Sequence, residues 1–313
     1  MATKIENISH SELHSNGCSS AHLYLPPDYE SIEAIELPPI SPASSSTNSL
    51  PEYTNIYNNG DSLIPKATDF HPTKQLQIQA SGLPLIRLPL PPQPDPIYIF
   101  NVAPTGGIEE AEYVSVRPAR NSGSCFLARA NDCSQKPLCT TTYRFGPGKP
   151  PKIRLEAEIS QNRQTEDIEI SCKGVLTRSV IMRTHLGTFE WRYSSRAERR
   201  AAQASVGEQV DCLLILDQVI KVAVAGGKQE ERRRKVGQFV RSSGLRTPGS
   251  KRSTAGNGGR LMLDLREWMD RKEERNEMEI LAATSCISML KKEVDRRRMH
   301  QAIAIMGGAS GGP

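Results

Sequence analysis

The sequence predicts a mostly β protein: a closed antiparallel barrel of ten to twelve strands around a central, hydrophobic C-terminal helix, preceded by a disordered tail. Three observations lead to this fold class. Prolines crowd the first third of the chain, apolar and polar residues then alternate along many short runs, and one helix near the C terminus has no polar face. We therefore expect a tail at residues 1–96, a barrel at 97–306 and a disordered, Gly-rich end at 307–313.

The tail has the composition of a disordered segment. It contains 14 of the 22 prolines and mixes Ser, Asn and isolated apolar residues without a period. Such a composition buries too little apolar surface to offset the entropy lost on ordering. The tail carries a net charge of −6 and the rest of the chain +11, so an acidic tail precedes a basic domain.

Two tetrapeptides in the tail resemble ligands of WW domains. Residues 26–29 (PPDY) follow the P-P-x-Y pattern, and residues 50–53 (LPEY) follow the looser L-P-x-Y pattern. Proline holds φ at about −65°, so such a peptide loses little entropy on docking in an aromatic groove. One predicted function is therefore an adaptor that recruits WW-domain proteins of the ubiquitin ligase type; the alternative is chance occurrence in a proline-rich tail. The predicted WW-ligand residues are Pro26, Pro27, Tyr29, Pro51 and Tyr53.

Strict alternation after residue 96 indicates antiparallel sheet. Apolar residues alternate with polar ones at 152–159, 167–172, 189–193 and 261–266, which places one face in a core and the other in water. No amphipathic helix intervenes, and this favours antiparallel over parallel pairing. Further strands are expected at 97–102, 112–117, 124–129, 140–145, 174–183, 211–216, 219–224 and 235–241.

The last predicted element is a helix at 278–298. From Ile280 to Leu290 it is apolar or small on every side, and a helix without a polar face must be surrounded. An eight-stranded barrel has no room for a helix about 10 Å wide, whereas an eleven-stranded can with a central helix has. The alternative is a sandwich with the helix on one face. A sandwich would need a charged stripe within 280–290, and the sequence has none there.

Four stretches resemble an uncharacterised group of filamentous-fungal proteins, and this likeness covers residues 97–306. The stretches are 187–192 (GTFEWR), 246–250 (RTPGS), 255–261 (AGNGGRL) and 285–299 (SCISMLKKEVDRRRM). The layout of about twelve strands followed by one hydrophobic helix is similar to that of the tubby C-terminal, LURP-one and phospholipid scramblase barrels. This resemblance implies a barrel threaded by the helix and assigns no binding residue.

Lysines and arginines gather in three predicted connections and at the end of the helix. Successive connections of an up-and-down meander alternate between the two ends of a barrel, so two basic rims are expected. The first two clusters would share one rim as the anionic-ligand site: Arg196, Arg199, Arg200, Arg232, Arg233, Arg234 and Lys235. The third cluster and the helix end would form the second rim: Arg246, Lys251, Arg252, Arg296, Arg297 and Arg298.

These rims favour an anionic partner. Each Lys or Arg near a charged membrane contributes about 1 kcal/mol, so the first predicted function is a non-enzymatic, intracellular module that binds anionic phospholipid or phosphoinositide headgroups. Nucleic acid is a less favoured partner, because no aromatic stacking platform or reading helix accompanies the charge. The alternative is solvated charge that keeps the barrel soluble and blocks edge pairing.

The sequence carries no catalytic or cofactor-binding signature, and we expect neither an enzyme nor a cofactor. Residues 244–251 approach the phosphate-binding pattern G-x-x-x-x-G-K-[ST], but Ser and Lys are in the wrong order and a strand follows. The glycines of 256–259 are expected to provide positive φ at a turn. The predicted barrel contains only two histidines, His185 and His300, and neither lies beside an obvious nucleophile.

No metal site is expected either. The tail has a cluster of His10, His14, Cys18 and His22, but a disordered segment offers no preformed geometry. Three cysteines of the barrel lack the usual spacing of zinc ligands and are expected to be buried apolar thiols. They are Cys125, Cys133 and Cys139.

The compartment follows from three features. Seven scattered cysteines fit reduced thiols, and the first residues have no secretory signal. The apolar stretch of the helix is shorter than the roughly 20 residues that span a bilayer, so no transmembrane segment is predicted. We expect a cytoplasmic or nuclear protein that is peripheral at the membrane when it binds lipid.

Overall fold

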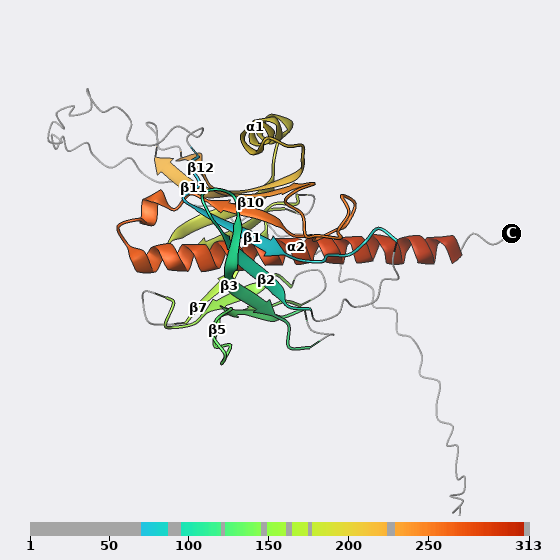
Figure 1. The fold of residues 1–313 in the computed structure, drawn as a ribbon, viewed down its shortest axis with the longest axis horizontal. Helices are drawn as coiled ribbons and strands as arrows, with labels where there is room; N and C mark the ends of the chain where they lie inside the picture. The colour runs from blue at the N-terminus through green and yellow to red at the C-terminus, as the bar shows by residue number, and fades with distance from the viewer. Residues whose placement is uncertain are drawn as a thin grey trace, which may run out of the picture. The chain divides into compact units, whose positions relative to one another are not determined.

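A computed structural model describes residues 70–86, 95–119, 123–144, 149–160, 165–174, 177–223 and 229–309. Thirteen strands form one antiparallel sheet that curls into a nearly closed barrel, and the helix α2 (Lys272–Ala309) runs through it (Figure 1). This confirms the predicted mostly β fold with a C-terminal helix; the strand count is slightly higher than the ten to twelve expected. In the part of the chain that the structure describes, no helix has both the length and the hydropathy to cross a membrane.

The strands run around the barrel as a meander. Their order in the sheet is β7-β6-β5-β4-β3-β2-β1-β13-β12-β11-β10-β9-β8. Their bounds are β1 (Lys74–Gln79), β2 (Ile97–Val102), β3 (Ile108–Val116), β4 (Cys125–Arg129), β5 (Pro137–Thr142), β6 (Lys152–Leu155), β7 (Glu166–Glu169), β8 (Ser171–Cys172), β9 (Val180–Thr184), β10 (Gly187–Tyr193), β11 (Val210–Ala223), β12 (Gln229–Ser242) and β13 (Gly259–Leu263).

Strand β1 corrects the predicted boundary of the tail. It lies within 1–96, which was expected to be disordered, yet it pairs with β2 on one side and β13 on the other. Leu76 and Ile78 are fully buried and alternate with glutamines, as in the other strands. The surrounding prolines and serines conceal this short run, so composition alone places the boundary too late. Residues 1–69 lie outside the described residues, and their disorder stays a prediction.

A single stretch of chain nearly closes the barrel. Strands β7 and β8 stand at opposite edges of the sheet but are separated in sequence only by Ile170, whose N–H donates to the Pro151 carbonyl at 2.8 Å. β7 pairs with β6, and β8 pairs with β9. Residues 166–169 therefore pair with β6, and residues 171–172 pair with β9. The sequence predicted this stretch as one strand.

Strand β11 is one long strand where the sequence predicted two, at 211–216 and 219–224. Asp217 and Gln218 look like turn residues, but both are buried. The Arg192 Nε–H donates to Asp217 Oδ2 at 2.6 Å, and a β-bulge between Leu216 and Asp217 adjusts the register. The chain therefore makes one turn fewer than predicted. Each connection after β11 lies at the end of the barrel opposite to the one predicted.

The helix α2 is enclosed as predicted, and its described bounds exceed the expected 278–298. From Met278 to Leu290 every residue is buried. Its few polar side chains have partners: Ser285 Oγ accepts the Trp191 Nε1–H at 2.9 Å, and Thr284 Oγ1 lies 3.0 Å from Cys139 Sγ. The helix continues to Ala309, into the end that was predicted to be disordered.

Two short elements complete the fold. Helix α1 (Arg196–Val206) joins β10 to β11, begins at the capping residue Ser195 and ends at Gly207, whose φ of 78° is left-handed. A 3-10 turn, η1 (Arg266–Trp268), leads from β13 into α2 and buries Trp268. Helix α2 therefore starts at the η1 end of the barrel and leaves at the end of the β12–β13 connection, which we call the exit end.

Candidate functional site

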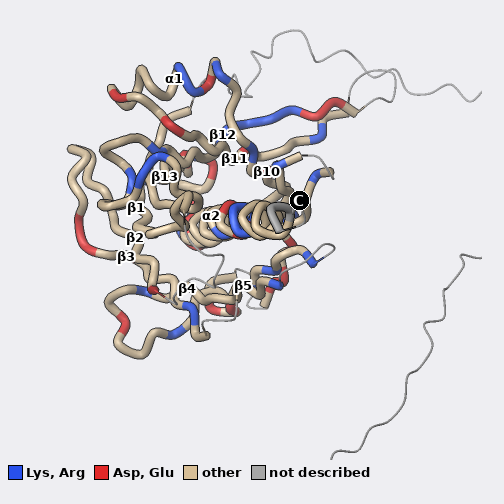
Figure 2. Tube along the Cα trace, turned by 90° about the vertical axis from the view of Figure 1, so that its right-hand side faces the viewer, with Lys and Arg blue, Asp and Glu red and all other residues tan. Residues whose placement is uncertain are grey.

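The structure regroups the predicted basic clusters. The α1 arginines lie in the connection between Tyr193 and Val210, which begins and ends at the exit end, where the clusters of 246–252 and 296–298 also lie. Figure 2 views the exit end along α2. The predicted pairing of 196–200 with 232–235 in one rim is wrong, because the extra turn expected within β11 reversed the ends of the later connections.

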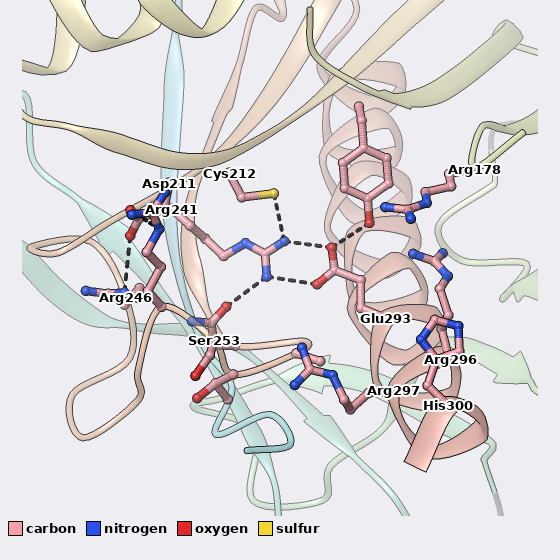
Figure 3. A pocket seen from close by; sticks show the side chains of 15 residues that line it. Arg178, Asp211, Cys212, Arg241, Arg246, Ser253, Glu293, Arg296, Arg297 and His300 are labelled. Carbon is pink, nitrogen blue, oxygen red and sulfur yellow. Dashed lines mark hydrogen bonds and ion pairs between the residues drawn. The ribbon is translucent and has the colours of Figure 1, made fainter. Parts of the chain in front are cut away.

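A pocket of about 380 Å³ lies beside α2 at the exit end (Figure 3). Six arginines and two carboxylates line it, which leaves a formal charge of +4 when His300 is counted as neutral. We call it the arginine pocket. The arginines come from the loop before β9, from β12, from the β12–β13 connection and from α2: Arg178, Arg241, Arg246, Arg252, Arg296 and Arg297.

The base of the arginine pocket is a buried ion pair between β12 and α2. Arg241 Nη1 and Nη2 donate to the two carboxylate oxygens of Glu293 at 2.8 and 2.7 Å, and these side chains are 6% and 10% exposed. Tyr193 Oη–H and the Gly256 N–H donate to the same carboxylate at 2.7 and 3.1 Å. Burial raises the pKa of the Glu293 carboxyl, but the charge and hydrogen bonds of Arg241 outweigh it and hold the pKa below its usual value. The pair is therefore ionised and adds no net charge.

The walls of the pocket supply the excess positive charge. Asp211 Oδ2 lies 3.1 Å from Arg246 Nη1 and its Oδ1 3.1 Å from Arg252 Nε, so one carboxylate serves two arginines. Arg296, Arg297 and Arg178 make no ion pair within the described ranges. Arg297 Nη1 is a buried donor that meets no acceptor among the residues described, and it faces the pocket (Figure 3). These guanidinium groups are available to an anion.

The structure divides the residues predicted at the exit end. Four of the predicted second rim line the pocket: Arg246, Arg252, Arg296 and Arg297. Lys251 is exposed on the same connection, and Arg298 Nη1 pairs with Asp295 Oδ1 at 3.4 Å. The α1 residues do not line it: Arg196 and Arg200 are exposed and Arg199 is half-buried.

The cluster of 232–235 lies on strand β12 and not in a connection, and its charges have partners. Arg232 pairs with Glu230 at 3.6 Å, and Arg233 pairs with Glu190 and Glu231 at 3.1 and 2.9 Å. Arg234 pairs with Glu267 and lies 5.7 Å above the Trp268 ring, while Lys235 bonds Gln238 and lies 4.4 Å from the Phe70 ring centre. The geometry thus favours the arginine pocket over this predicted anionic-ligand site.

Sequence reasoning missed three residues that shape the pocket. Arg178 and Arg241 are single basic residues within predicted strands, and Glu293 is one acid in a basic helix end. Clusters of charge are visible along the chain, whereas these three residues meet only through strand pairing and the path of α2.

A second hollow of about 320 Å³ lies on another face of α2 at the same end. Ile97, Ile287, Leu290 and Val294 give it an apolar wall, and Lys291 adds a charge. The loop of 255–257 separates the two hollows, because Gly256 lines this one while its neighbours line the arginine pocket.

Glycine allows that loop to approach α2. Gly256 has a φ of 67°, and a Cβ there would lie 2.6 Å from the Leu290 carbonyl oxygen. Gly258 and Gly259 do not have positive φ, so the prediction for 256–259 is right only in part. At Gly258 a side chain has no room, because a Cβ would lie 2.1 Å from the Ile78 carbonyl oxygen.

Other chemistry-bearing residues lie elsewhere. His185 Nδ1 lies 2.7 Å from Glu166 Oε2 and its Nε2 3.4 Å from Glu277 Oε2; the three side chains could hold a divalent cation at the seam of the barrel. Cys139 is buried as predicted and burial raises its pKa to about 12, but Cys133 is exposed, contrary to the prediction. The WW-type motifs and the tail histidines lie outside the described residues.

Comparison with known proteins identifies no relative. No family model, curated protein sequence or solved structure matches the chain. The resemblance to filamentous-fungal proteins and to tubby-like barrels stays a prediction.

Proposed function

We propose that this protein is a non-enzymatic binding module whose arginine pocket takes a ligand with several phosphate groups, such as the headgroup of a phosphoinositide or another anionic phospholipid. The observation that carries the proposal is the charge balance of the pocket: six arginines face two carboxylates. A ligand with two or more phosphates would neutralise the excess of four positive charges, whereas a singly charged anion would leave most of it.

The choice of arginine supports phosphate as the ligand group. The planar guanidinium presents a fork of donors that matches two oxygens of a phosphate, and such charge-assisted bonds are about twice as strong as neutral ones. Four separate elements bring these guanidinium groups to one pocket, so a ligand there can be contacted from several sides. The volume of about 380 Å³ lies within the range of roughly 300–1,000 Å³ typical of small-ligand pockets.

The acids of the pocket favour binding over catalysis. Glu293 is held as a carboxylate by Arg241. Asp211 lies against two arginines, so each acid of the pocket already has cationic partners. Burial raises the pKa of the Cys212 thiol, which keeps this neighbour of Arg241 protonated near neutral pH. A concave site lined mainly by arginines also suits a compact headgroup better than a nucleic acid strand.

Titration with soluble inositol 1,4,5-trisphosphate tests the proposal. Replacing Arg296 and Arg297 by Gln should weaken binding by at least about tenfold, because each charge-assisted bond contributes roughly 1.5–3 kcal/mol. The matched control is Lys221→Gln/Arg232→Gln, which removes the same charge from two exposed positions on the β11–β12 pair. Equal weakening by both variants, or no binding by wild type, would refute a defined site in this pocket. Inositol itself, which lacks phosphate, should not bind.

A further inference from the structure

Helix α2 ends in an exposed apolar segment beyond the barrel. Its last turns project past the strands (Figure 1). Four large apolar side chains there are 50–74% exposed: Met299, Ile303, Ile305 and Met306. Leu85 and Ile86 are exposed beside them, since Gln301 Nε2 donates to the Leu85 carbonyl oxygen at 2.7 Å.

This concentration differs from the rest of the surface. The exposed large apolar side chains of the described ranges number ten, and six belong to this end; the other four, Tyr98, Ile108, Ile220 and Met269, come from separate elements. Single exposed apolar residues are ordinary, whereas a contiguous group marks a surface that meets a partner. We call Leu85, Ile86, Met299, Ile303, Ile305 and Met306 the apolar tip.

The charge along α2 indicates which partner this is. Residues 291–298 hold five Lys or Arg against two acids, Glu293 and Asp295, and residues 299–309 hold no Asp, Glu, Lys or Arg. The arginine pocket lies just before the tip, because Arg296, Arg297 and His300 line it. Basic residues followed directly by an uncharged apolar end are the pattern of a segment that enters an anionic membrane, with its cations at the headgroups and its apolar side chains among the acyl chains.

We propose that the apolar tip inserts into one leaflet of an anionic membrane while the arginine pocket holds a phosphorylated headgroup of the same membrane. This inference rests on the proposed function, and it assigns the source of the phosphate to a lipid. Residues 299–306 rise about 12 Å as a helix at 1.5 Å per residue. That length reaches into one leaflet of a hydrocarbon core about 30 Å thick and does not cross it.

Sedimentation with vesicles tests the insertion on the full chain. The vesicles are phosphatidylcholine with or without 5% phosphatidylinositol 4,5-bisphosphate, and inositol 1,4,5-trisphosphate serves as the soluble ligand. Ile303→Gln/Met306→Gln should lower binding to the bisphosphate vesicles by about tenfold or more, with affinity for the soluble ligand unchanged. The matched control, Ile108→Gln/Met269→Gln, replaces two exposed apolar residues away from the tip and should bind as wild type does.

The outcomes separate the two proposals. If Ile303→Gln/Met306→Gln binds the vesicles and the soluble ligand as tightly as wild type does, insertion is overturned and the pocket proposal stands. A failure of wild type to bind the soluble ligand would instead overturn the pocket proposal. Insertion then has its own readout: the Ile303→Trp variant should be quenched by brominated acyl chains in anionic vesicles, and lack of quenching would overturn it. A dimer in light scattering that Ile303→Gln/Met306→Gln dissociates would assign the tip to a second copy and overturn the proposal.

Discussion

Arg241 is a charged residue built into the wall of the barrel. Its guanidinium donates to both oxygens of Glu293, to Asn257 Oδ1 at 2.8 Å and to Cys212 Sγ at 3.0 Å. A buried charge persists in a protein only when such partners replace the lost water. The residue thereby ties β12 and the β12–β13 connection to α2, directly below the arginine pocket.

Removing one member of this pair should be costly. We predict that Arg241→Leu lowers the free energy of unfolding by about 3–5 kcal/mol, because Glu293 is left as an uncompensated buried charge. Urea unfolding followed by circular dichroism measures the change. The double variant Arg241→Leu/Glu293→Leu should recover most of the loss, since no lone charge remains. If the double variant is as unstable as the single one, packing and not charge explains the effect.

At the scale of single elements, α1 depends on one carboxylate with two tasks. The Glu198 side chain accepts the Ser195 N–H at 2.7 Å, which caps the helix, and two guanidinium N–H groups of Arg192 at 3.0 and 2.6 Å. The hydrogen bonds of Arg192 lower the pKa of Glu198 to about 2 from its ordinary 4.5. The folded state therefore binds this proton less readily than the unfolded state, so Glu198 stabilises the fold above about pH 4.5 and loses this effect as the pH falls towards 2.

The corresponding prediction concerns the pH dependence of stability. Glu198→Gln should lower the melting temperature at pH 7 and should flatten its decline between about pH 4.5 and 2, because the titrating group is gone. The Arg192 and Glu198 side chains are 22% and 34% exposed, and solvent screening of the pair limits the effect to roughly 1 kcal/mol. Thermal unfolding at several pH values measures both. Glu230→Gln, at an exposed position of β12, is the control. If the melting temperature of Glu198→Gln falls with pH as steeply as that of wild type, Glu198 is not the group that titrates in this range.

Elements with one strong local signal were predictable from the sequence. The residues at 280–290 are apolar on all sides, and a helix of that kind has one physical solution, enclosure. Strand β11 was not predictable in the same way, because Asp217 and Gln218 carry the local signature of a turn. Their burial is stabilised by Arg192 and by Glu267, whose Oε1 accepts the Gln218 Nε2–H at 3.5 Å. These partners come from elsewhere in the chain.

At the scale of the whole molecule, the turn predicted within β11 assigned the basic clusters to the wrong ends of the barrel. Each turn reverses the direction of the chain, so a single surplus turn exchanged the ends assigned to the later clusters. The sequence places Arg246, Arg252, Arg296 and Arg297 in one group with Lys251 and Arg298, and the first four line one pocket. They stay together because both of their segments follow β11, so the surplus turn shifts them equally. Arg178 and Arg241 could not be assigned to the pocket, because these isolated residues reach it only through the pairing of the strands around α2.

The nearly closed sheet also determines where the chain can be cut. Strand β1 pairs with both β2 and β13, so its loss opens the sheet between them and exposes the core around Leu76 and Ile78. We predict that residues 70–313 unfold cooperatively with the urea midpoint of the full chain. A fragment of residues 97–313 should lack a cooperative transition and should bind the dye ANS, as chains with loosened packing do.

The control for this pair of fragments separates the strand from mere shortening. In the full-length chain, Leu76→Asp/Ile78→Asp places two charges in the core while keeping every residue, and it should reproduce the behaviour of the 97–313 fragment. Gln75→Asp/Gln79→Asp changes two partly buried neighbours on the other face of β1 and should be much milder. A stable, cooperatively folded 97–313 fragment would contradict the prediction, because it would mean that β2 and β13 can pair directly. Such pairing would shrink the ring around α2 by one strand, and the width of a helix leaves little room for that.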